Sequence, residues 1–333
     1  MNRRDFLRAA AAAAAGAFFT RGITGKLMAY GQEDAPKTAA ANSPAVYITR
    51  DISPKGLMAA YKALNREMAA KVAIKLSMGE PGGHHYLAPG LIKELVDSVN
   101  GTFVDGNTAY GGKRSTVEAH MQTARDHGFA AVAPVDILDA EGETALPVAG
   151  GKHLKEVRVG SHFGNYGSIL VLSHFKGHLM GGFGGALKNI AIGIASPAGK
   201  CLVHTAGKSA TNIMDGPEKV EDFQEAMAES AEGMIRAMGR ENMAYINVMN
   251  NLSIDCDCDS NPAAPELPDI GILSSLDPVA VDKACVDLIY AADPKKSASF
   301  RERMESRKSS YILAHGERLG IGRRNYSLVD LDA

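Results

Sequence analysis

The sequence contains no tryptophan and only four cysteines among its 333 residues. So few cysteines exclude a small fold built on disulfides. A concentrated basic stretch is also missing, and the formal net charge is −2, so nucleic acid is not an expected partner. Hydrophobic residues make up 45% of the chain and charged residues 22%. This composition excludes disordered and fibrous proteins and predicts a globular one.

The N-terminal region lacks an apolar run long enough for a stable transmembrane anchor. Ala9 to Phe19 is alanine-rich and roughly half the length of a bilayer-spanning helix. It follows the paired Arg3 and Arg4, with Phe6 and Leu7 close behind, a layout typical of a twin-arginine signal. The alternative is a basic amphipathic helix on a cytoplasmic protein. We expect the twin-arginine translocon to be a partner during export, and the mature protein to be periplasmic or otherwise extracytoplasmic.

From Pro44 onward, short β-rich runs alternate with amphipathic stretches. The expected strands are 45–49, 71–76, 101–105, 130–135, 156–159, 168–174, 244–248 and 269–273, and the expected helices are 53–69, 89–99, 115–127, 220–238 and 278–291. This alternation predicts an α/β fold with a mainly parallel or mixed sheet, helices on both faces and room for a smaller lobe. We assign residues 1–41 to the signal and linker and 44–333 to a single α/β domain. In such sheets, ligands bind at the carboxyl ends of the strands.

The densest group of reactive side chains follows the apolar strand expected at 168–174. His174, Lys176 and His178 lie at its carboxyl end, with Lys188 and Asn189 soon after. The glycines of this stretch include Gly181, Gly182, Gly184 and Gly185. Amides of such glycines approach an anion closely or adopt positive φ, and lysines neutralise it. We therefore predict that these glycines and Asn189 bind a cofactor or ligand. A glycine-rich hairpin with surface histidines is the alternative.

A second group follows the strand expected at 244–248, where Cys256 and Cys258 alternate with acidic residues. Thiolates favour zinc, copper(I) and iron–sulfur clusters. Two cysteines cannot complete a tetrahedral metal site, so further ligands are needed from elsewhere in the chain, His174 among the candidates. The predicted metal ligands are Cys256, Cys258, His178, Cys201 and His204. The alternative is an acidic surface turn with incidental thiols.

Further ionisable residues stand at strand or helix ends. Lys75 ends one expected strand, and Lys75, Glu80, Asp105 and Asn107 are candidates for the floor of the same cleft. Asp282, one turn into the helix expected at 278–291, is a candidate acid, base or supporting residue. The predicted catalytic residues are Lys75, His174, Lys176, Lys188 and Asp282.

At these motifs the sequence resembles the domain of unknown function 362 family, often associated with iron–sulfur clusters or ferredoxins. The resemblance runs from about Val72 to Ile289. Its motifs include Lys75 to Glu80, Asp105 to Asn107 with Arg114 and His120, His174 to Asn189, Gly199-Lys200 with His204, Asp255 to Cys258, Asp269 to Gly271, and Asp277 to Ala280. Many members also carry a ferredoxin segment, which we expect near the loop between His204 and Glu218. Here that loop is short and has no cysteine, so the resemblance does not imply ferredoxin activity.

Two hypotheses about function follow. The first is a metal- or iron–sulfur-associated redox protein or enzyme with a redox partner, in which Cys256 and Cys258 bind the metal ion or cluster. The second is a metal-free enzyme or binding protein for a small anionic metabolite, held by Lys75, Lys176 and Lys188. A purely structural envelope protein is disfavoured by the clustering of ionisable residues at strand ends. Both hypotheses require the histidines and thiols to converge on one pocket.

Overall fold

The structure is a computed structural model that describes residues 43–69 and 71–333. The twin-arginine signal and its linker, predicted in residues 1–41, lie outside the described residues. No helix within the described ranges combines the length and apolar character needed to cross a membrane.

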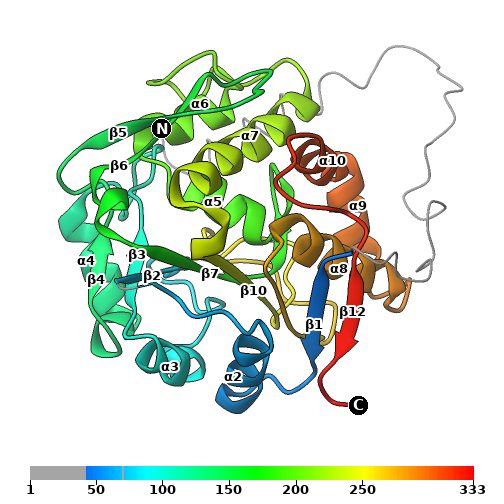
Figure 1. Cartoon of the computed structure of the whole chain (residues 1–333). Coiled ribbons are helices and arrows are strands. Elements are labelled where there is room, and N and C mark those ends of the chain that lie inside the picture. The colour runs from blue at the N-terminus through cyan, green and yellow to red at the C-terminus, as the bar shows by residue number, and fades with distance from the viewer. Residues whose placement is uncertain (1–42, 70) are drawn as a thin grey trace, which may run out of the picture.

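An eight-stranded sheet forms the centre of the described part of the chain (Figure 1). In spatial order its strands are β12 (Ser327–Asp330), β1 (Ala45–Thr49), β11 (Gly271–Ser275), β10 (Met243–Met249), β7 (Ser168–His174), β2 (Val72–Lys75), β3 (Thr102–Asp105) and β4 (Val135–Ile137). All neighbours from β10 to β4 are parallel, and β11 is antiparallel to both of its neighbours. The predicted α/β class with a mainly parallel or mixed sheet is confirmed.

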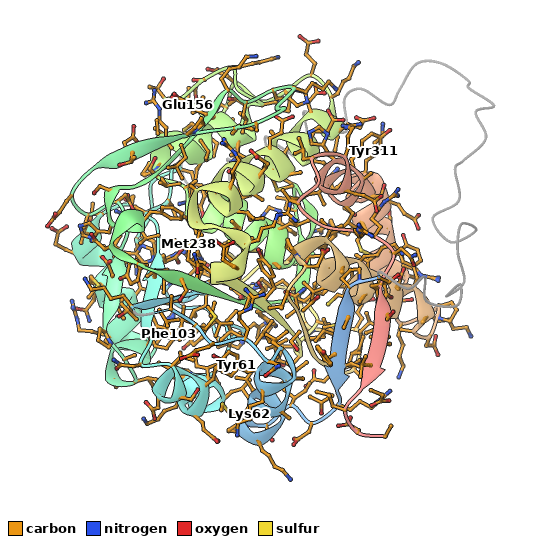
Figure 2. The ribbon with its side chains drawn as sticks, in the orientation of Figure 1. Tyr61, Lys62, Phe103, Glu156, Met238 and Tyr311 are labelled. Carbon is orange, nitrogen blue, oxygen red and sulfur yellow. The ribbon has the colours of Figure 1, made fainter. Side chains whose placement is uncertain are left out.

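Helices cover both faces of this sheet (Figure 1). One face packs against α2 (Pro54–Ala63), α3 (Pro89–Ser98) and α4 (Val117–Asp126). The other carries α5 (Ala186–Gly193), α6 (Pro197–His204), α7 (Val220–Met238), α8 (Pro278–Ala291), α9 (Ala298–Ser306) and α10 (Ser310–Arg318). Each face has its own apolar core. Phe103 of β3 lies inside the molecule, whereas Lys62 of α2 points outward from it (Figure 2).

Two short antiparallel pairs and three 3₁₀ turns complete the described fold. One pair is β5 (Glu143–Pro147) with β6 (Glu156–Gly160), and the other is β8 (Lys176–His178) with β9 (Gly182–Gly184). The 3₁₀ turns are η1 (Phe129–Ala131), η2 (Ser161–Asn165) and η3 (Arg240–Asn242). The β8–β9 hairpin directly follows the central strand β7.

The structure corrects two predicted elements. The first helix ends at Ala63 and not at Ala69, because Asn65 adopts a left-handed φ of 45° that stops the helix. The strand predicted at 130–135 is a 3₁₀ turn followed by β4, which begins at Val135. Gly128, at φ 83°, turns the chain inward so that the Phe129 ring packs against that of Phe103, with centroids 5.6 Å apart.

The glycine-rich stretch 177–199 contains two helices that the sequence analysis did not predict. Gly185 precedes α5, and Ser196 caps α6 by accepting a hydrogen bond from the Gly199 amide. The Ser196-Pro197 pair is a helix-start signal and would have located α6. These two helices bring Lys188, Asn189 and His204 to the edge of the sheet where β2, β3 and β7 end.

Candidate functional site

A cavity of about 110 Å³ lies at the carboxyl ends of β2, β3 and β7. Parallel pairing aligns these ends, since Lys75 of β2 sits beside Val104 of β3 and Val171 of β7. The predicted site residues that line it are Lys75, His174, Lys176, His178, Gly184, Gly185, Lys188, Asn189, His204, Cys256 and Cys258. The histidines of the β8 region and the thiol pair therefore converge on one pocket.

Asp282 lies away from the cavity lining. Its carboxylate is fully buried and accepts hydrogen bonds from the amides of Ala186 (2.7 Å) and Leu187 (3.0 Å) and from the Asn247 side chain (2.7 Å). Burial raises its pKa to about 6, against the effect of these hydrogen bonds. A Cβ at Gly185 would come within 2.3 Å of this carboxylate. Asp282 therefore caps α5, and that role explains the glycine at 185.

Three other predicted residues also lie outside the lining. Cys201, on α6, is buried beside Ile213, and burial raises the pKa of its thiol. The amide of Gly181 donates to Nδ1 of His178 at 2.8 Å, so it is already engaged. Gly182 has φ 79°, and a Cβ there would lie 2.7 Å from Cβ of Ser309. The last two glycines shape the β8–β9 turn.

Lys75 and Asp105 form the floor of the cavity. Nζ of the buried Lys75 donates to Oδ1 of Asn189 at 2.9 Å and lies 3.2 Å from the Asp105 carboxylate. Burial lowers the pKa of Lys75 despite Asp105. Burial alone would raise the pKa of Asp105, but Lys75 and His120 hold it well below its usual range. A Cβ at Gly193 would lie 2.2 Å from Cε of Lys75, so only glycine leaves room for the lysine.

Two cationic side chains of the lining were not predicted as site residues. Arg114 is buried and binds Glu80 through Nε at 2.8 Å, and one of its terminal nitrogens lies 3.8 Å from Asp105. Lys200, on α6, is also buried and donates to the carbonyl of Ala195. Burial lowers its pKa to about 8. Neither residue ends a strand, and the rule that favoured strand-end positions missed both.

Lys176 is held by a buried carboxylate behind the cavity wall. Its Nζ donates to Asp257 at 2.6 Å, and Nδ1 of His174 lies 2.8 Å from the other oxygen of that carboxylate. Nε2 of His174 faces the carbonyl of Asn250 at 2.5 Å. Burial opposes both charges, yet Asp257 raises the pKa of Lys176, and His174 with Lys176 lowers that of Asp257 to about 2. Asp257 thus fixes two lining residues at once.

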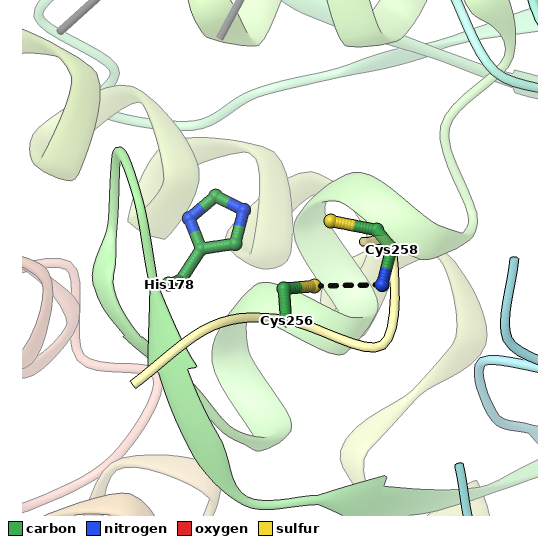
Figure 3. A group of neighbouring side chains, drawn as sticks. All are labelled: His178, Cys256 and Cys258. Atoms are coloured by element: carbon green, nitrogen blue, oxygen red, sulfur yellow. Dashed lines mark hydrogen bonds between the residues drawn. The ribbon is translucent and has the colours of Figure 1, made fainter. Parts of the chain in front are cut away.

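The thiol pair faces His178 across the cavity wall (Figure 3). One ligand atom each from His178, Cys256 and Cys258 lie within 4.8 Å of one another. Sγ of Cys256 accepts a hydrogen bond from the Cys258 amide at 3.3 Å. A hydrogen bond from the Cys258 side chain, helped by Lys188 and Lys176, holds the pKa of Cys256 well below its usual range. These contacts favour the thiolate form of Cys256.

The hydrogen bonds of His178 fix its tautomer. Nδ1 accepts from the amides of Gly181 (2.8 Å) and Met180 (3.3 Å). Burial and Lys188 lower its pKa well below 6.5, so the ring is neutral and carries its hydrogen on Nε2. That nitrogen faces the sulfurs in Figure 3.

These residues fit the metal groups suggested by the family resemblance only in part. A four-cysteine iron–sulfur cluster does not fit, because of the four cysteines only Cys256 and Cys258 lie together in the described structure. A single ion has three candidate ligands in His178 and the two cysteines. Binding at Nε2 needs the other tautomer of His178, which forfeits both amide hydrogen bonds. As arranged, the group suits hydrogen-bonded thiols better than a metal ion.

His204 has the opposite tautomer. Its Nδ1 lies 2.7 Å from the carbonyl of Lys200 and must donate to it. Burial lowers its pKa to about 4, so the ring is neutral and Nε2 keeps a free lone pair. His204 stacks at a tilt on Phe223, with ring centroids 5.0 Å apart. The cavity thus contains one neutral histidine whose Nε2 donates and one whose Nε2 accepts.

Two solved structures are similar to part of this chain. One is the lactate racemase apoprotein from Thermoanaerobacterium thermosaccharolyticum, with 14% identity, a TM-score of 0.42 and coverage of 74% of this chain and 57% of the other. The second is a Thermotoga maritima protein from structural genomics, with 11% identity, a TM-score of 0.40 and coverage of 81% and 59%. This chain spans less than two thirds of the length of either structure.

The curated proteins include no match to this sequence. A family profile does match it, that of the domain of unknown function DUF362, over residues 72–287. The match spans the strands that end at the cavity, the β8–β9 hairpin and the thiol pair. The chain belongs to the domain of unknown function 362 family.

Proposed function

We propose that this protein is an enzyme that binds a small anionic molecule, a carboxylate or a phosphate, in the cavity. One observation carries the proposal. Five cationic side chains line the cavity, against a single carboxylate, that of Asp105. The five are Lys75, Arg114, Lys176, Lys188 and Lys200. A concave, largely buried surface with this excess of positive charge attracts anions strongly, because its low dielectric weakens screening.

The five cations have different roles in this proposal. Lys75, Arg114 and Lys176 are bound to Asp105, Glu80 and Asp257, so they mainly supply a fixed field. Lys188 forms no hydrogen bond or ion pair with any residue in the described ranges. Lys200 makes one hydrogen bond, to a carbonyl. These last two ammonium groups are therefore available to contact the ligand directly.

The chemistry available to a bound anion supports an enzyme over a passive binding protein. The cavity is bordered by the Cys256 thiol, whose pKa its neighbours lower, by an acceptor nitrogen on His204 and by Lys200, whose pKa is about 8. Buried groups with displaced pKa values in a cleft are typical of catalytic sites. Lys200 would exchange a proton near neutral pH, and Lys188 would neutralise charge that develops on the ligand.

Ligand-induced stabilisation tests this function. Inorganic phosphate and a panel of small carboxylates should raise the melting temperature of the wild-type protein, and a chelator should leave the effect unchanged. Chloride at equal ionic strength is the control for general screening. The proposal fails if no anion in the panel raises the melting temperature above that control.

A metal centre is the second candidate, favoured by the three ligand atoms of His178, Cys256 and Cys258. A bound ion would act as a Lewis acid or, if redox-active, exchange electrons with a partner protein. Protein purified without a histidine tag should then contain stoichiometric metal, and Cys256→Ser with Cys258→Ser should remove it. A metal-free protein that still binds phosphate would leave only the first candidate.

We also propose that the protein reaches the periplasm or cell exterior through the twin-arginine translocon. The paired Arg3 and Arg4 and the apolar stretch that follows support this route. Replacing both arginines with lysine should retain the full-length precursor in the cytoplasmic fraction. Export of this double-lysine variant at the wild-type level would contradict the proposal.

A further inference from the structure

The four cysteines of this chain occupy unlike surroundings. Cys201 is buried on α6 beside Ile213, Cys285 is fully buried in the core, and burial raises the pKa of each thiol. Cys256 and Cys258 instead line the cationic cavity. The described structure therefore offers two thiols to a molecule in the cavity, and two internal thiols that serve as controls.

The surroundings of Cys256 orient its sulfur for reaction. The Cys258 amide donates to Sγ at 3.3 Å, and Nε2 of His178 faces the two sulfurs (Figure 3). His178 is itself anchored by the amides of Gly181 and Met180. The sulfur is thus held by an amide hydrogen bond and faces a histidine ring that is itself fixed, as is common around catalytic nucleophiles.

The strand carrying His178 is tied closely to the cysteine loop. The amide of Gly177 donates to the carbonyl of Ser253 at 2.8 Å, and a Cβ at Gly177 would lie 2.3 Å from the carbonyl oxygen of Ile254. Only glycine permits this approach. The hairpin and the loop therefore hold His178 and Cys256 in a fixed relation.

Lys188 adds selectivity for charge. Its side chain packs along Gly184, lines the same cavity, and is near enough to Cys256 to affect the charge of the thiol. An anionic molecule drawn to Lys188 is delivered beside the sulfur. A neutral molecule of the same size gains nothing from this attraction.

We propose that Cys256 is a nucleophile for small anions that carry an electrophilic carbon. This inference rests on the proposed function and names its substrate class. In the step, a sulfur electron pair forms an S–C bond while the bond from that carbon to the leaving group breaks. The leaving group departs with the bonding pair, and the cysteine becomes a thioether or thioester. The thiol proton is released to water as the sulfur attacks, so the step needs no co-reactant beyond the electrophile.

Two alkylating reagents of similar size test this step. Iodoacetate is anionic and iodoacetamide is neutral, and each reaction forms an S–C bond and releases iodide. Mass spectrometry of peptides gives the rate at each cysteine of the folded, full-length, metal-free protein. At Cys256 the ratio of the iodoacetate rate to the iodoacetamide rate should exceed that of the unfolded chain by about tenfold or more. Inorganic phosphate should slow the iodoacetate reaction.

Variants separate the contributions of charge and fold. Lys188→Ala should lower the ratio of the iodoacetate rate to the iodoacetamide rate at Cys256 by about tenfold. Lys55→Ala, at an exposed position on α2, is the matched control and should change neither rate. A melting curve of each variant excludes unfolding as the cause. Cys256→Ser should abolish the fast reaction.

Three outcomes would overturn the assignment of Cys256. They are equal preference for the two reagents in folded and unfolded protein, the fast label falling on Cys258, and stoichiometric metal that protects both thiols. If phosphate still stabilises the protein while the reagent preference is absent, only the nucleophile is refuted. If phosphate has no effect on stability either, the proposed function fails with it.

Discussion

Two groups of buried charges in this protein are built in opposite ways. On α7, the fully buried Glu229 accepts the amides of Lys152, His153 and Leu154 at 2.7–2.9 Å and faces Nε2 of His315 at 2.8 Å. In the cavity, by contrast, Lys188 has no such partner among the described residues. The Glu229 carboxylate is fully hydrogen-bonded within the protein, whereas the Lys188 ammonium group has no hydrogen-bond partner among the described residues.

The contrast distinguishes charges that maintain the fold from charges that face a ligand. Glu225, also on α7, follows the pattern of Glu229, with Lys152, His153 and Arg318 around its carboxylate. These three residues hold its pKa at about 2 against the effect of burial. A cluster of His153, Asp222 and Glu225 resembles a metal site in composition. Lys152 and Arg318 already pair with Glu225. We therefore assign this cluster a structural role.

The largest effect should come from breaking the filled network. Glu229→Ala leaves three amides and a histidine without their acceptor, and should lower the free energy of unfolding by about 3–5 kcal/mol. Urea denaturation measures this change. Glu94→Ala, at an exposed position on α3, should stay within about 0.5 kcal/mol of the wild type. A loss below about 1 kcal/mol for Glu229→Ala would remove the distinction.

Lowering the pH should destabilise the protein through His204, which lines the cavity. His204 has a pKa of about 4 in the folded protein against 6.5 ordinarily, so between these values the unfolded chain binds a proton that the folded one excludes. This residue's contribution to stability is present above pH 6.5 and is lost as the pH falls toward 4. The loss should amount to about 3 kcal/mol.

His204→Gln isolates that contribution from those of other groups. The variant should lose less stability than the wild type between pH 6.5 and 4, as measured by urea denaturation at each pH. Curves of equal slope for the two proteins would show that His204 is not kept neutral by burial.

A smaller effect is expected from filling the space beside Lys75. Gly193→Ala places a Cβ 2.2 Å from Cε of Lys75, and should reduce stability by about 1–3 kcal/mol and weaken phosphate binding. Gly90→Ala is the matched control, since a Cβ there meets no atom within 4 Å. It should be neutral or stabilise α3 by about 0.5–1 kcal/mol. If both variants behave alike, the contact with Lys75 is unimportant.

The smallest change in the free energy of unfolding is expected from a substitution of Lys188. Lys188→Ala should alter the free energy of unfolding by less than about 0.5 kcal/mol, because no described partner loses a contact. The affinity of the Lys188→Ala variant for phosphate, measured by calorimetric titration, should nevertheless fall about tenfold. A variant that is strongly destabilised, with unchanged phosphate binding, would reverse the comparison.

The sequence alone predicted the sheet because hydrophobic patterns mark its buried strands. β7 and α8 have the predicted bounds, 168–174 and 278–291, and the strand-end rule located Lys75 and the His174 region. That the thiols lie close to His178 could only be assumed from the sequence. No local pattern shows that residues 177 and 254 come into backbone contact.

Other features depend on partners that a linear pattern does not reveal. Asp282 follows a helix start and was assigned a chemical role, yet it caps α5, nearly a hundred positions away. Gly185 was predicted to bind a ligand, but it makes room for Asp282, and Gly193, which was not among the predicted site residues, makes room for Lys75. Arg114 and Lys200 reach the cavity only because loops and helices pack over the strand ends.

The cavity walls come from segments far apart in the chain, with Lys75 in β2, Lys188 in α5 and Cys256 in the loop after β10. A ligand that touches all three therefore adds contacts between segments that are far apart in the sequence. Amide hydrogen exchange at these three segments should slow together when the ligand binds. No fragment that omits one of them retains the whole binding surface.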